Sequence, residues 1–231
     1  MKLNKLVNFQ NKFKSILIQY VDHKNFIYYS DKYFNKGKLL DVGCGNQRHK
    51  KYLAGKIDEY VGLDHEDTIH NLLDVDVIGT AYETNLENDS FDYVLCNAVL
   101  EHLEEPKSAI NECHRILKKD GICIYTVPLF WHLHEEPRDF FRYTNHGLTH
   151  LFKEQFEIVE LYPGSGFWIT FSTMFCYYID RFNFKIVRFT FIIPIIQILV
   201  QSLSFLLSKI KLKSIKGEEW TIMYTIIARK K

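Results

Sequence analysis

One short stretch, residues 39–46, constrains what this chain can fold into. It reads Leu-Leu-Asp-Val-Gly-Cys-Gly-Asn, an apolar run that ends in an acid and two glycines. The pattern predicts a first β-strand at 38–42 that turns tightly into a first helix at 47–54. Glycine allows such a turn and lets a ligand approach the main chain closely. The N-terminus of the predicted helix would offer free N–H groups to a ligand.

A second strand is predicted at 59–64, and it ends in Asp64, nineteen residues after Gly45. In α/β sheets an acid at this position suits hydrogen bonds to the two hydroxyls of a ribose, so we expect a nucleoside cofactor. The dinucleotide pattern G-x-G-x-x-G is not met, because Arg48 stands at the third glycine position. Asp41 suits the amino group of an amino acid, and S-adenosylmethionine is the ligand that combines a ribose with an amino acid.

Two motifs resemble those of a known family. The stretch 41–45, Asp-Val-Gly-Cys-Gly, resembles the first motif of the class I S-adenosylmethionine-dependent methyltransferases. The run 90–94, Ser-Phe-Asp-Tyr-Val, followed by Leu-Glu-His at 100–102, looks like the fourth motif of the small-molecule methyltransferases of that class. The resemblance covers about residues 38–162. It implies that S-adenosylmethionine is the cofactor and that its site is lined by Asp41, Gly43, Cys44, Gly45, Asp64, Thr80 and Asn97.

Thr80 departs from the pattern of the family. It stands where related methyltransferases often carry the aspartate that accepts a hydrogen bond from the adenine amino group. Threonine can accept a hydrogen bond but carries no charge, so the expected adenine contact is an uncharged one.

The alternation of predicted strands and helices implies an α/β fold. We expect a seven-stranded, mostly parallel Rossmann-like methyltransferase sheet with helices on both faces and an apolar helical insertion between strands six and seven. Ligands of such sheets bind at the carboxyl ends of the strands. Further strands are predicted at 75–78, 91–97, 122–127, 156–161 and 220–228, and further helices at 106–118 and, capped by Thr144, through 152.

The segment 131–144, after the fifth predicted strand, is the richest in side chains suited to chemistry. It resembles a pattern found in methyltransferases associated with cell-surface glycan gene sets. A hydroxyl acceptor needs a base, and histidine titrates near neutral pH. The candidate catalytic residues are His102, His132, His134 and Asp139, the last as an orienting partner, with Glu135 as its alternative. Three alternatives stay open. His102 could be a structural helix cap, and the other two histidines could lie in a solvated loop. The third alternative is a His-x-His-Glu zinc site, although no metal is predicted.

The same segment holds the predicted contacts to the acceptor. Arg138 and Arg142 could clamp a phosphate or carboxylate of the acceptor, and Tyr143 lies beside them in the sequence. Salt bridges from the two arginines to acids of the segment are the alternative.

The C-terminal third contains an unusually apolar stretch. Residues 189–208 carry no charge, and twenty helical residues span roughly 30 Å, which makes them a transmembrane candidate. Polar residues nevertheless recur at spacings of three and four, which makes a stripe along one helix face. We interpret the segment as an amphipathic or re-entrant helix on the membrane, with contact through 163–213, and leave an ordinary packed helix or a dimer interface as alternatives. The stripe consists of Thr190, Pro194, Gln197, Gln201, Ser204 and Ser208.

Four parts of the chain are predicted: an N-terminal helical cap (1–37), a cofactor-binding core (38–162), the apolar insertion (163–217) and a final strand that completes the sheet (218–231). A net charge of +1 gives no electrostatic case for nucleic-acid binding. Five scattered cysteines without a C-x-x-C pair indicate a reducing compartment, and no secretory signal is expected. We expect a cytoplasmic protein at the inner face of the cell membrane.

Together these features predict an S-adenosylmethionine-dependent methyltransferase. Its expected acceptor is a small or lipid-linked molecule, a glycan among the options, at the membrane surface. A quinone or other lipid methylase is the first alternative. The second is a non-catalytic, membrane-associated scaffold that retains the fold.

Overall fold

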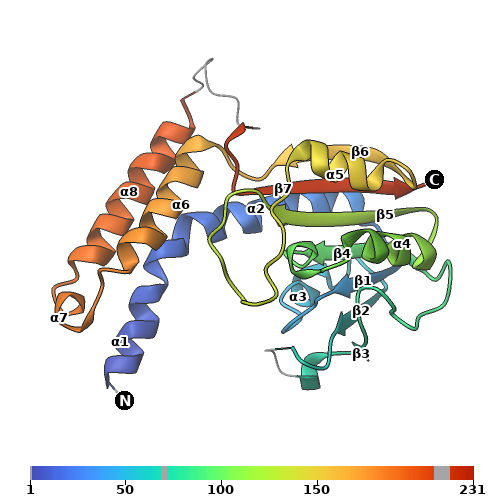
Figure 1. The fold of residues 1–231 in the computed structure, drawn as a ribbon, viewed down its shortest axis with the longest axis horizontal. Helices are drawn as coiled ribbons and strands as arrows, with labels where there is room; N and C mark the ends of the chain where they lie inside the picture. The colour runs from blue at the N-terminus through green and yellow to red at the C-terminus, as the bar shows by residue number, and fades with distance from the viewer. Residues whose placement is uncertain (1, 69–71, 211–218) are drawn as a thin grey trace. The chain divides into compact units, whose positions relative to one another are not determined.

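The computed structural model describes residues 2–68, 72–210 and 219–231 (Figure 1). The chain forms two compact units. Residues 1–27 and 163–222 make a helical unit, and residues 28–162 and 223–231 make an α/β unit. The helical unit thus combines the N-terminal segment with the apolar insertion. Positions 211–218, where the predicted insertion ends and the final segment begins, lie outside the described residues.

The α/β unit contains a seven-stranded sheet with the strand order β3-β2-β1-β4-β5-β7-β6 (Figure 1). Strands β1 to β5 pair in parallel, and β7 runs antiparallel to β5. This is the seven-stranded, mostly parallel α/β sheet that the sequence predicts. The strands are β1 (Lys38–Val42), β2 (Glu59–Asp64), β3 (Val77–Ile78), β4 (Phe91–Asn97), β5 (Leu117–Pro128), β6 (Phe156–Pro163) and β7 (Met223–Lys230).

The first helix after β1 is much shorter than predicted. In place of a helix at 47–54, a run of turns leads into α3 (Lys50–Leu53). Gly45 and Gln47 have positive φ angles of 52° and 50°, which right-handed helix excludes. The predicted role of a helix N-terminus in ligand binding is therefore wrong for this turn, because a helix of one turn has no appreciable dipole.

Other helix and strand boundaries differ from the predicted ones by a few residues. Helix α4 (Pro106–Ile116) ends before Lys118, which was expected in its last turn. The chain instead enters β5 at Leu117, and the Lys118 ammonium lies 2.9 Å from both carboxylate oxygens of Asp92 on β4. Helix α5 (Asn145–Phe152) begins where predicted, because the Thr144 hydroxyl accepts the N–H of Gly147 at 3.0 Å. Two short 3-10 helices complete the unit, η2 (Leu72–Asp74) and η3 (Leu100–His102).

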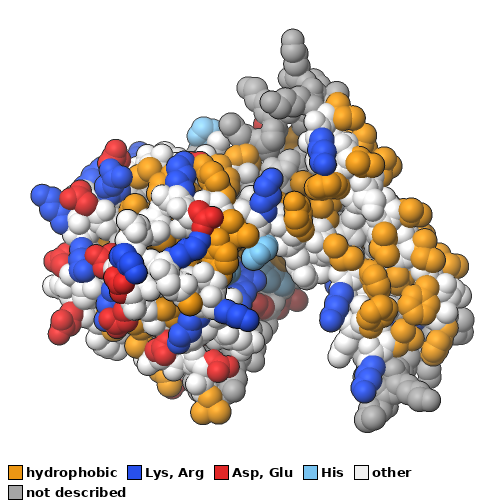
Figure 2. All heavy atoms as spheres, turned by 180° about the vertical axis from the view of Figure 1, so that it is seen from behind, with side chains coloured by type: hydrophobic (Ala, Val, Ile, Leu, Met, Phe, Trp, Pro, Cys, Tyr) orange, Lys and Arg blue, Asp and Glu red, His pale blue; other side chains and the backbone are white. Residues whose placement is uncertain are grey.

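The helical unit contains α1 (Lys2–Asn11), η1 (Phe13–Ser15), the first part of α2 (Ile16–Tyr33), α6 (Phe167–Asp180), α7 (Lys185–Arg188) and α8 (Ile192–Ser208). The uncharged run 189–208 is not one helix, because Phe191, with φ 55°, interrupts it before α8. Within the described ranges, no helix combines the length and the apolar character that crossing a membrane requires. Figure 2 shows hydrophobic side chains gathered over this unit with lysines and arginines between them.

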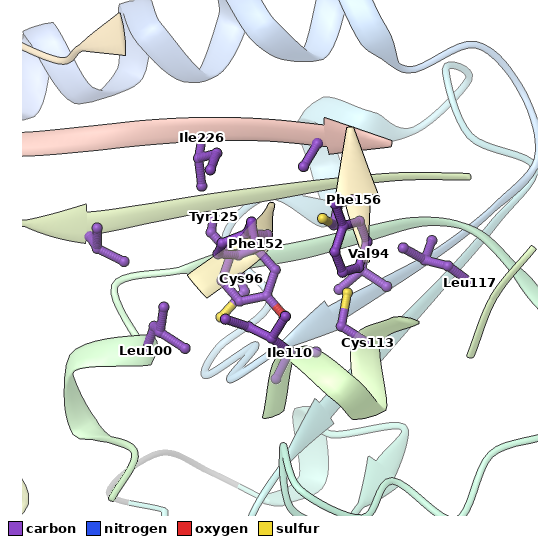
Figure 3. Packing of buried hydrophobic residues seen from close by; sticks show 14 of the residues in the cluster. Val94, Cys96, Leu100, Ile110, Cys113, Leu117, Tyr125, Phe152, Phe156 and Ile226 are labelled. Carbon is purple, nitrogen blue, oxygen red and sulfur yellow. The ribbon is translucent and has the colours of Figure 1, made fainter. Parts of the chain in front are cut away.

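The core of the α/β unit lies between the sheet and helices α4 and α5 (Figure 3). Ile110 and Cys113 of α4 and Phe152 of α5 meet Val94 of β4 and Tyr125 of β5 there, and all five are buried. Close packing of this kind makes the strand ends rigid supports for the loops that follow them. Those loops carry the candidate site.

Candidate functional site

The loops after β1 and β4 meet at the point where the strand order changes direction. The chain passes from β1 to β2 on one side, whereas β4 lies on the other side of β1. Gly43 after β1 has φ +69°, and a Cβ atom there would lie 2.4 Å from Cγ2 of Val99 after β4. Only glycine fits this position. Open α/β sheets bind ligands at such switch points.

Asp64, at the end of β2, is buried and faces the glycine turn. Its Oδ2 accepts the backbone N–H of Gly45 at 2.9 Å, and its Oδ1 accepts the N–H of His65 at 2.9 Å. A carboxylate offers about four acceptor positions. Asp64 therefore fixes the turn and still has capacity for two hydroxyl groups, which is what a ribose requires.

Asp41, in β1, is buried beside the same turn. Burial raises the pKa of its carboxyl group to about 7, against the opposing effects of the hydrogen bond that the Tyr60 hydroxyl donates and of the positive charge of Arg48. An ammonium group brought next to Asp41 would favour its ionised form. The residue thus suits the amino group of an amino-acid ligand, as the sequence predicts.

The remaining predicted cofactor residues also follow strand ends. Cys44 is buried, and burial raises the pKa of its thiol to about 12, so it lines the turn as a neutral group. Thr80, just after β3, is exposed, and its hydroxyl accepts the N–H of Glu83 at 3.1 Å. Asn97 is the last residue of β4 and is half-buried.

The segment 131–144 is tied to η3 by its backbone and by one hydroxyl. The N–H groups of Phe140 and Phe141 donate to the carbonyl of Glu101 at 2.9 and 3.2 Å. The Tyr143 hydroxyl donates to the carbonyl of Leu100 at 3.0 Å. The polar segment is thereby held against the end of β4, next to the glycine turn.

Two of the three candidate histidines come together. The ring centroids of His102 and His134 lie 4.7 Å apart, in edge-to-face contact. Asp139 lies beside His134: its Oδ2 accepts the backbone N–H of His134 at 3.0 Å and lies 3.3 Å from Nδ1, which makes no hydrogen bond within the described residues. His132 is exposed, and its ring centroid lies 6.3 Å from that of His134. The structure therefore brings His102, His134 and Asp139 into one cluster, with His132 at its edge.

Arg142 makes the salt bridge that the sequence analysis left as an alternative. Its Nη1 and Nη2 lie 2.6 and 2.8 Å from the two oxygens of Asp139, and this pairing holds the pKa of Asp139 well below its usual range. The same guanidinium donates to three backbone carbonyls of the segment, at 131, 132 and 141. Tyr143 is buried, whereas the Arg138 side chain is 56% exposed. Arg138 Nη2 lies 3.6 Å from Asp67 Oδ2, and its side chain is the most exposed of the three predicted acceptor contacts.

Sequence reasoning missed Glu101. Its side chain is 1% exposed, burial raises the pKa of its carboxyl group to about 8, and Oε2 has no hydrogen-bond partner among the described residues. Glu101, His102 and His134 each offer one potential metal ligand, and these atoms lie within 4.8 Å of one another. This group differs from the His-x-His-Glu zinc site considered above, because it includes Glu101. The signal was its place in the Leu-Glu-His motif, of which only the histidine was used.

Comparisons with known proteins bear on this arrangement. Residues 40–125 match the family described as "Methyltransferase domain". The chain is 29% identical over 105 residues to the ubiquinone biosynthesis O-methyltransferase of Actinobacillus pleuropneumoniae. The aligned segment covers 39% of this chain and 45% of that protein. Phosphoethanolamine N-methyltransferase 2 of Haemonchus contortus, solved in complex with phosphomonomethylethanolamine and S-adenosylhomocysteine, has a TM-score of 0.54 at 14% identity over 90% of this chain and 52% of that chain. The structure of the [4+2]-cyclase SpnF has a TM-score of 0.56 at 17% identity, and the likeness covers 91% of this chain and 80% of the cyclase.

Residues 40–125 form a methyltransferase domain, and the α/β unit has the fold of the class I S-adenosylmethionine-dependent methyltransferases. The matched segment runs from β1 into β5 and includes the glycine turn, Asp64 and the Leu-Glu-His motif. The two structural likenesses show the fold alone. The chain spans a little under half the length of the Actinobacillus relative.

S-adenosylmethionine is the cofactor of this methyltransferase class, and the donor set of the turn fits it. Asp64 has acceptor capacity for the ribose hydroxyls, and Asp41 provides a buried carboxyl for the amino group. Gly43 and Gly45 allow the backbone to approach the ligand closely. The methyltransferase motifs thus coincide with the polar groups that the structure gathers at the switch point.

Proposed function

We propose that this chain transfers the methyl group of S-adenosylmethionine to a hydroxyl of a small or lipid-linked acceptor at the inner, cytoplasmic face of the cell membrane. The observation that carries the proposal is the His102–His134–Asp139 cluster, which the segment 131–144 holds against the end of β4. When bound, the cofactor supplies an electrophilic methyl group. A base of this chain would take the hydroxyl proton as the acceptor oxygen bonds to the methyl carbon, and the neutral thioether would leave with the electron pair of the broken bond.

His134 is the best placed base. With Asp139 beside Nδ1, the tautomer that carries its proton on Nδ1 leaves Nε2 as the acceptor for the substrate proton. Asp139 would stabilise the imidazolium that forms, and Arg142 keeps Asp139 ionised and in place. His102 packs edge-to-face against the same ring and limits its movement.

Two features favour an acceptor that is at least partly apolar. Leu133, Phe140 and Phe141 are exposed on the segment that carries the histidines, and apolar side chains next to a base suit a hydrophobic substrate. Arg138, also on this segment, suits a phosphate or carboxylate. A quinone precursor is the first alternative acceptor, and the name of the Actinobacillus relative is consistent with it. A phosphorylated lipid carrier, with or without a glycan, uses the same two features.

The test has two parts. Calorimetry with S-adenosylhomocysteine on the purified full chain and on Asp64→Ala is expected to give binding that the variant loses. Labelled S-adenosylmethionine is then incubated with membrane lipid extracts, and labelled product is expected only with the intact cluster. Cofactor binding without transfer to any extract would instead support the scaffold alternative. Absence of binding to the unaltered chain would overturn the proposal.

A metal-assisted version of the same reaction is the second candidate. Glu101 favours it, because its buried Oε2 has no hydrogen-bond partner in the part of the chain that the structure describes. A divalent ion held by Glu101, His102 and His134 could lower the pKa of an acceptor hydroxyl. Transfer that is abolished by EDTA and restored by a divalent ion would select this version. Transfer that persists in EDTA would leave His134 as the base.

A further inference from the structure

Helix α8 has its polar side buried and its apolar side exposed, the reverse of a helix on an ordinary water-soluble domain. Gln197, Gln201 and Ser204 are buried, whereas the leucines and isoleucines of the opposite side face outward. The outward stripe is Ile195, Leu199, Leu203 and Leu206, with exposed fractions of 52%, 63%, 58% and 61%. These positions are three or four residues apart and therefore form one continuous row.

Hydrogen bonds hold the buried side in this orientation. Gln201 accepts the backbone N–H of Leu17 at 2.9 Å and donates to the carbonyl of Phe13 at 2.7 Å. Gln197 donates to the carbonyl of Cys176 on α6 at 3.2 Å. A rotation of α8 that hid its leucines would break these bonds and leave buried amides unpaired, which is unfavourable. The apolar row is therefore a fixed feature of the helical unit.

Helix α6 packs beside α8 and extends the apolar face. Phe171, Met174 and Tyr178 are exposed at helical spacing along α6. Phe189 and Phe191 add exposed rings just before α8. Monomeric soluble proteins rarely expose continuous apolar surface on this scale, so the face calls for a partner.

The charge of the helical unit selects the kind of partner. Its two segments contain twelve lysines and arginines and four acids, whereas the α/β unit contains seventeen and twenty-four. The helical unit is thus strongly basic and the α/β unit acidic, although the whole chain is nearly neutral. A second copy of the same face would bring like charges together. A surface with anionic headgroups above an apolar layer complements both the rows of hydrophobic side chains and the basic residues.

We infer that α8 and α6 dock this unit in the plane of an anionic lipid bilayer, with their apolar faces at the acyl boundary and basic side chains at the headgroups. Lys12, Arg181 and Lys209 are exposed close to the ends of the helices and are placed for such contacts. Since no described helix is suited to spanning, the mode is interfacial. Docking of this kind would bring a lipid-borne acceptor to the enzyme. That benefit, unlike the docking itself, rests on the proposed function.

Vesicle flotation of the full chain tests the inference. We expect binding to vesicles of phosphatidylcholine with phosphatidylglycerol, much weaker binding without phosphatidylglycerol, and loss of at least about tenfold in affinity in the double variant Leu199→Gln/Leu203→Gln. Leu73→Gln is the matched control, because it removes an exposed leucine from the α/β unit. Both leucines of the double variant are exposed, so its circular dichroism and cofactor binding are expected to be unchanged.

Three outcomes would overturn the inference. Equal binding to uncharged vesicles would overturn the headgroup assignment. A failure to bind any vesicle would overturn lipid docking. Concentration-dependent dimers without vesicle binding, lost in the double variant, would assign the face to a second copy. Calorimetry with S-adenosylhomocysteine in the absence of lipid reports on the methyltransferase separately, so the two proposals fail independently.

Discussion

The carboxylate of Asp64 accepts the backbone N–H of Gly45 at 2.9 Å, although nineteen residues separate them in the chain. This bond joins the end of β2 to the turn after β1. The acid therefore does two things at once, since it shapes the turn and presents its remaining acceptor positions to a ligand.

Asp64→Asn separates these two roles. The amide oxygen can still accept the Gly45 N–H, but the side chain loses its charge and part of its acceptor capacity. We expect S-adenosylhomocysteine to bind about 10- to 100-fold more weakly, because hydrogen bonds to a charged group are worth about 1.5–3 kcal/mol. Calorimetry measures the loss. Glu66→Gln, an exposed position in the same loop, is the control, and an equal loss there would contradict the assignment to Asp64.

His134→Gln tests the base. We expect the rate of methyl transfer under saturating substrates to fall by about 10²- to 10⁴-fold, which is the usual contribution of general base catalysis. Binding of S-adenosylhomocysteine is expected to be unchanged. The assay uses the acceptor found in lipid extracts, and the control is His146→Gln, an exposed histidine on α5. A variant that retains its rate would exclude His134 as the base.

Much of the α/β unit could be predicted because local signals and tertiary demands agree in it. Strands β1, β2 and β4 were predicted with the observed boundaries, since each is an apolar run bounded by turn residues. The cap at Thr144 followed from its side-chain chemistry. The helix after β1 was overestimated, because a positive φ at Gln47 is a property of the folded turn that the sequence does not reveal.

The residue types of the site could be predicted from the sequence, but their salt bridges, hydrogen bonds and burial could not. The histidines and acids of 131–144 were visible, yet nothing in their spacing distinguishes an acceptor clamp from the Arg142–Asp139 salt bridge. Glu101 was overlooked because an acid in a motif is expected to be exposed, whereas here it is buried. The polar stripe of α8 was also visible, but which side faces inward depends on α6 and η1.

Arg142→Lys tests whether Arg142 holds the catalytic segment in place. Lysine cannot make the paired bonds to Asp139 together with the bonds to backbone carbonyls, so we expect the free energy of unfolding to fall by about 1–3 kcal/mol. Urea denaturation followed by tryptophan fluorescence measures it. Arg138→Lys alters an exposed side chain nearby and is expected to change it by less than about 0.5 kcal/mol. Similar effects of both substitutions would contradict a structural role for Arg142.

Glu101 predicts a specific dependence of stability on pH. Its pKa is raised from 4.5 in the unfolded chain to about 8 in the fold, so the folded chain binds the extra proton between these values. The contribution of this carboxyl to stability is therefore fully present below pH 4.5 and is lost as the pH rises through 8. In Glu101→Gln the group is neutral at every pH. We expect the variant and the unaltered chain to have similar free energies of unfolding at pH 5, and the variant to be more stable by roughly 4 kcal/mol at pH 9.

Urea denaturation at the two pH values measures this difference, with Glu104→Gln as the control because Glu104 is exposed in the same loop. Subtracting the unaltered chain at each pH cancels the opposite contributions of Asp139 and Glu112, whose pKa values their arginine partners hold low. A difference that is the same at both pH values would mean that Glu101 is already ionised in the fold. The buried carboxylate would then require a compensating positive charge, which is the role of a bound cation in the metal-assisted version of the reaction.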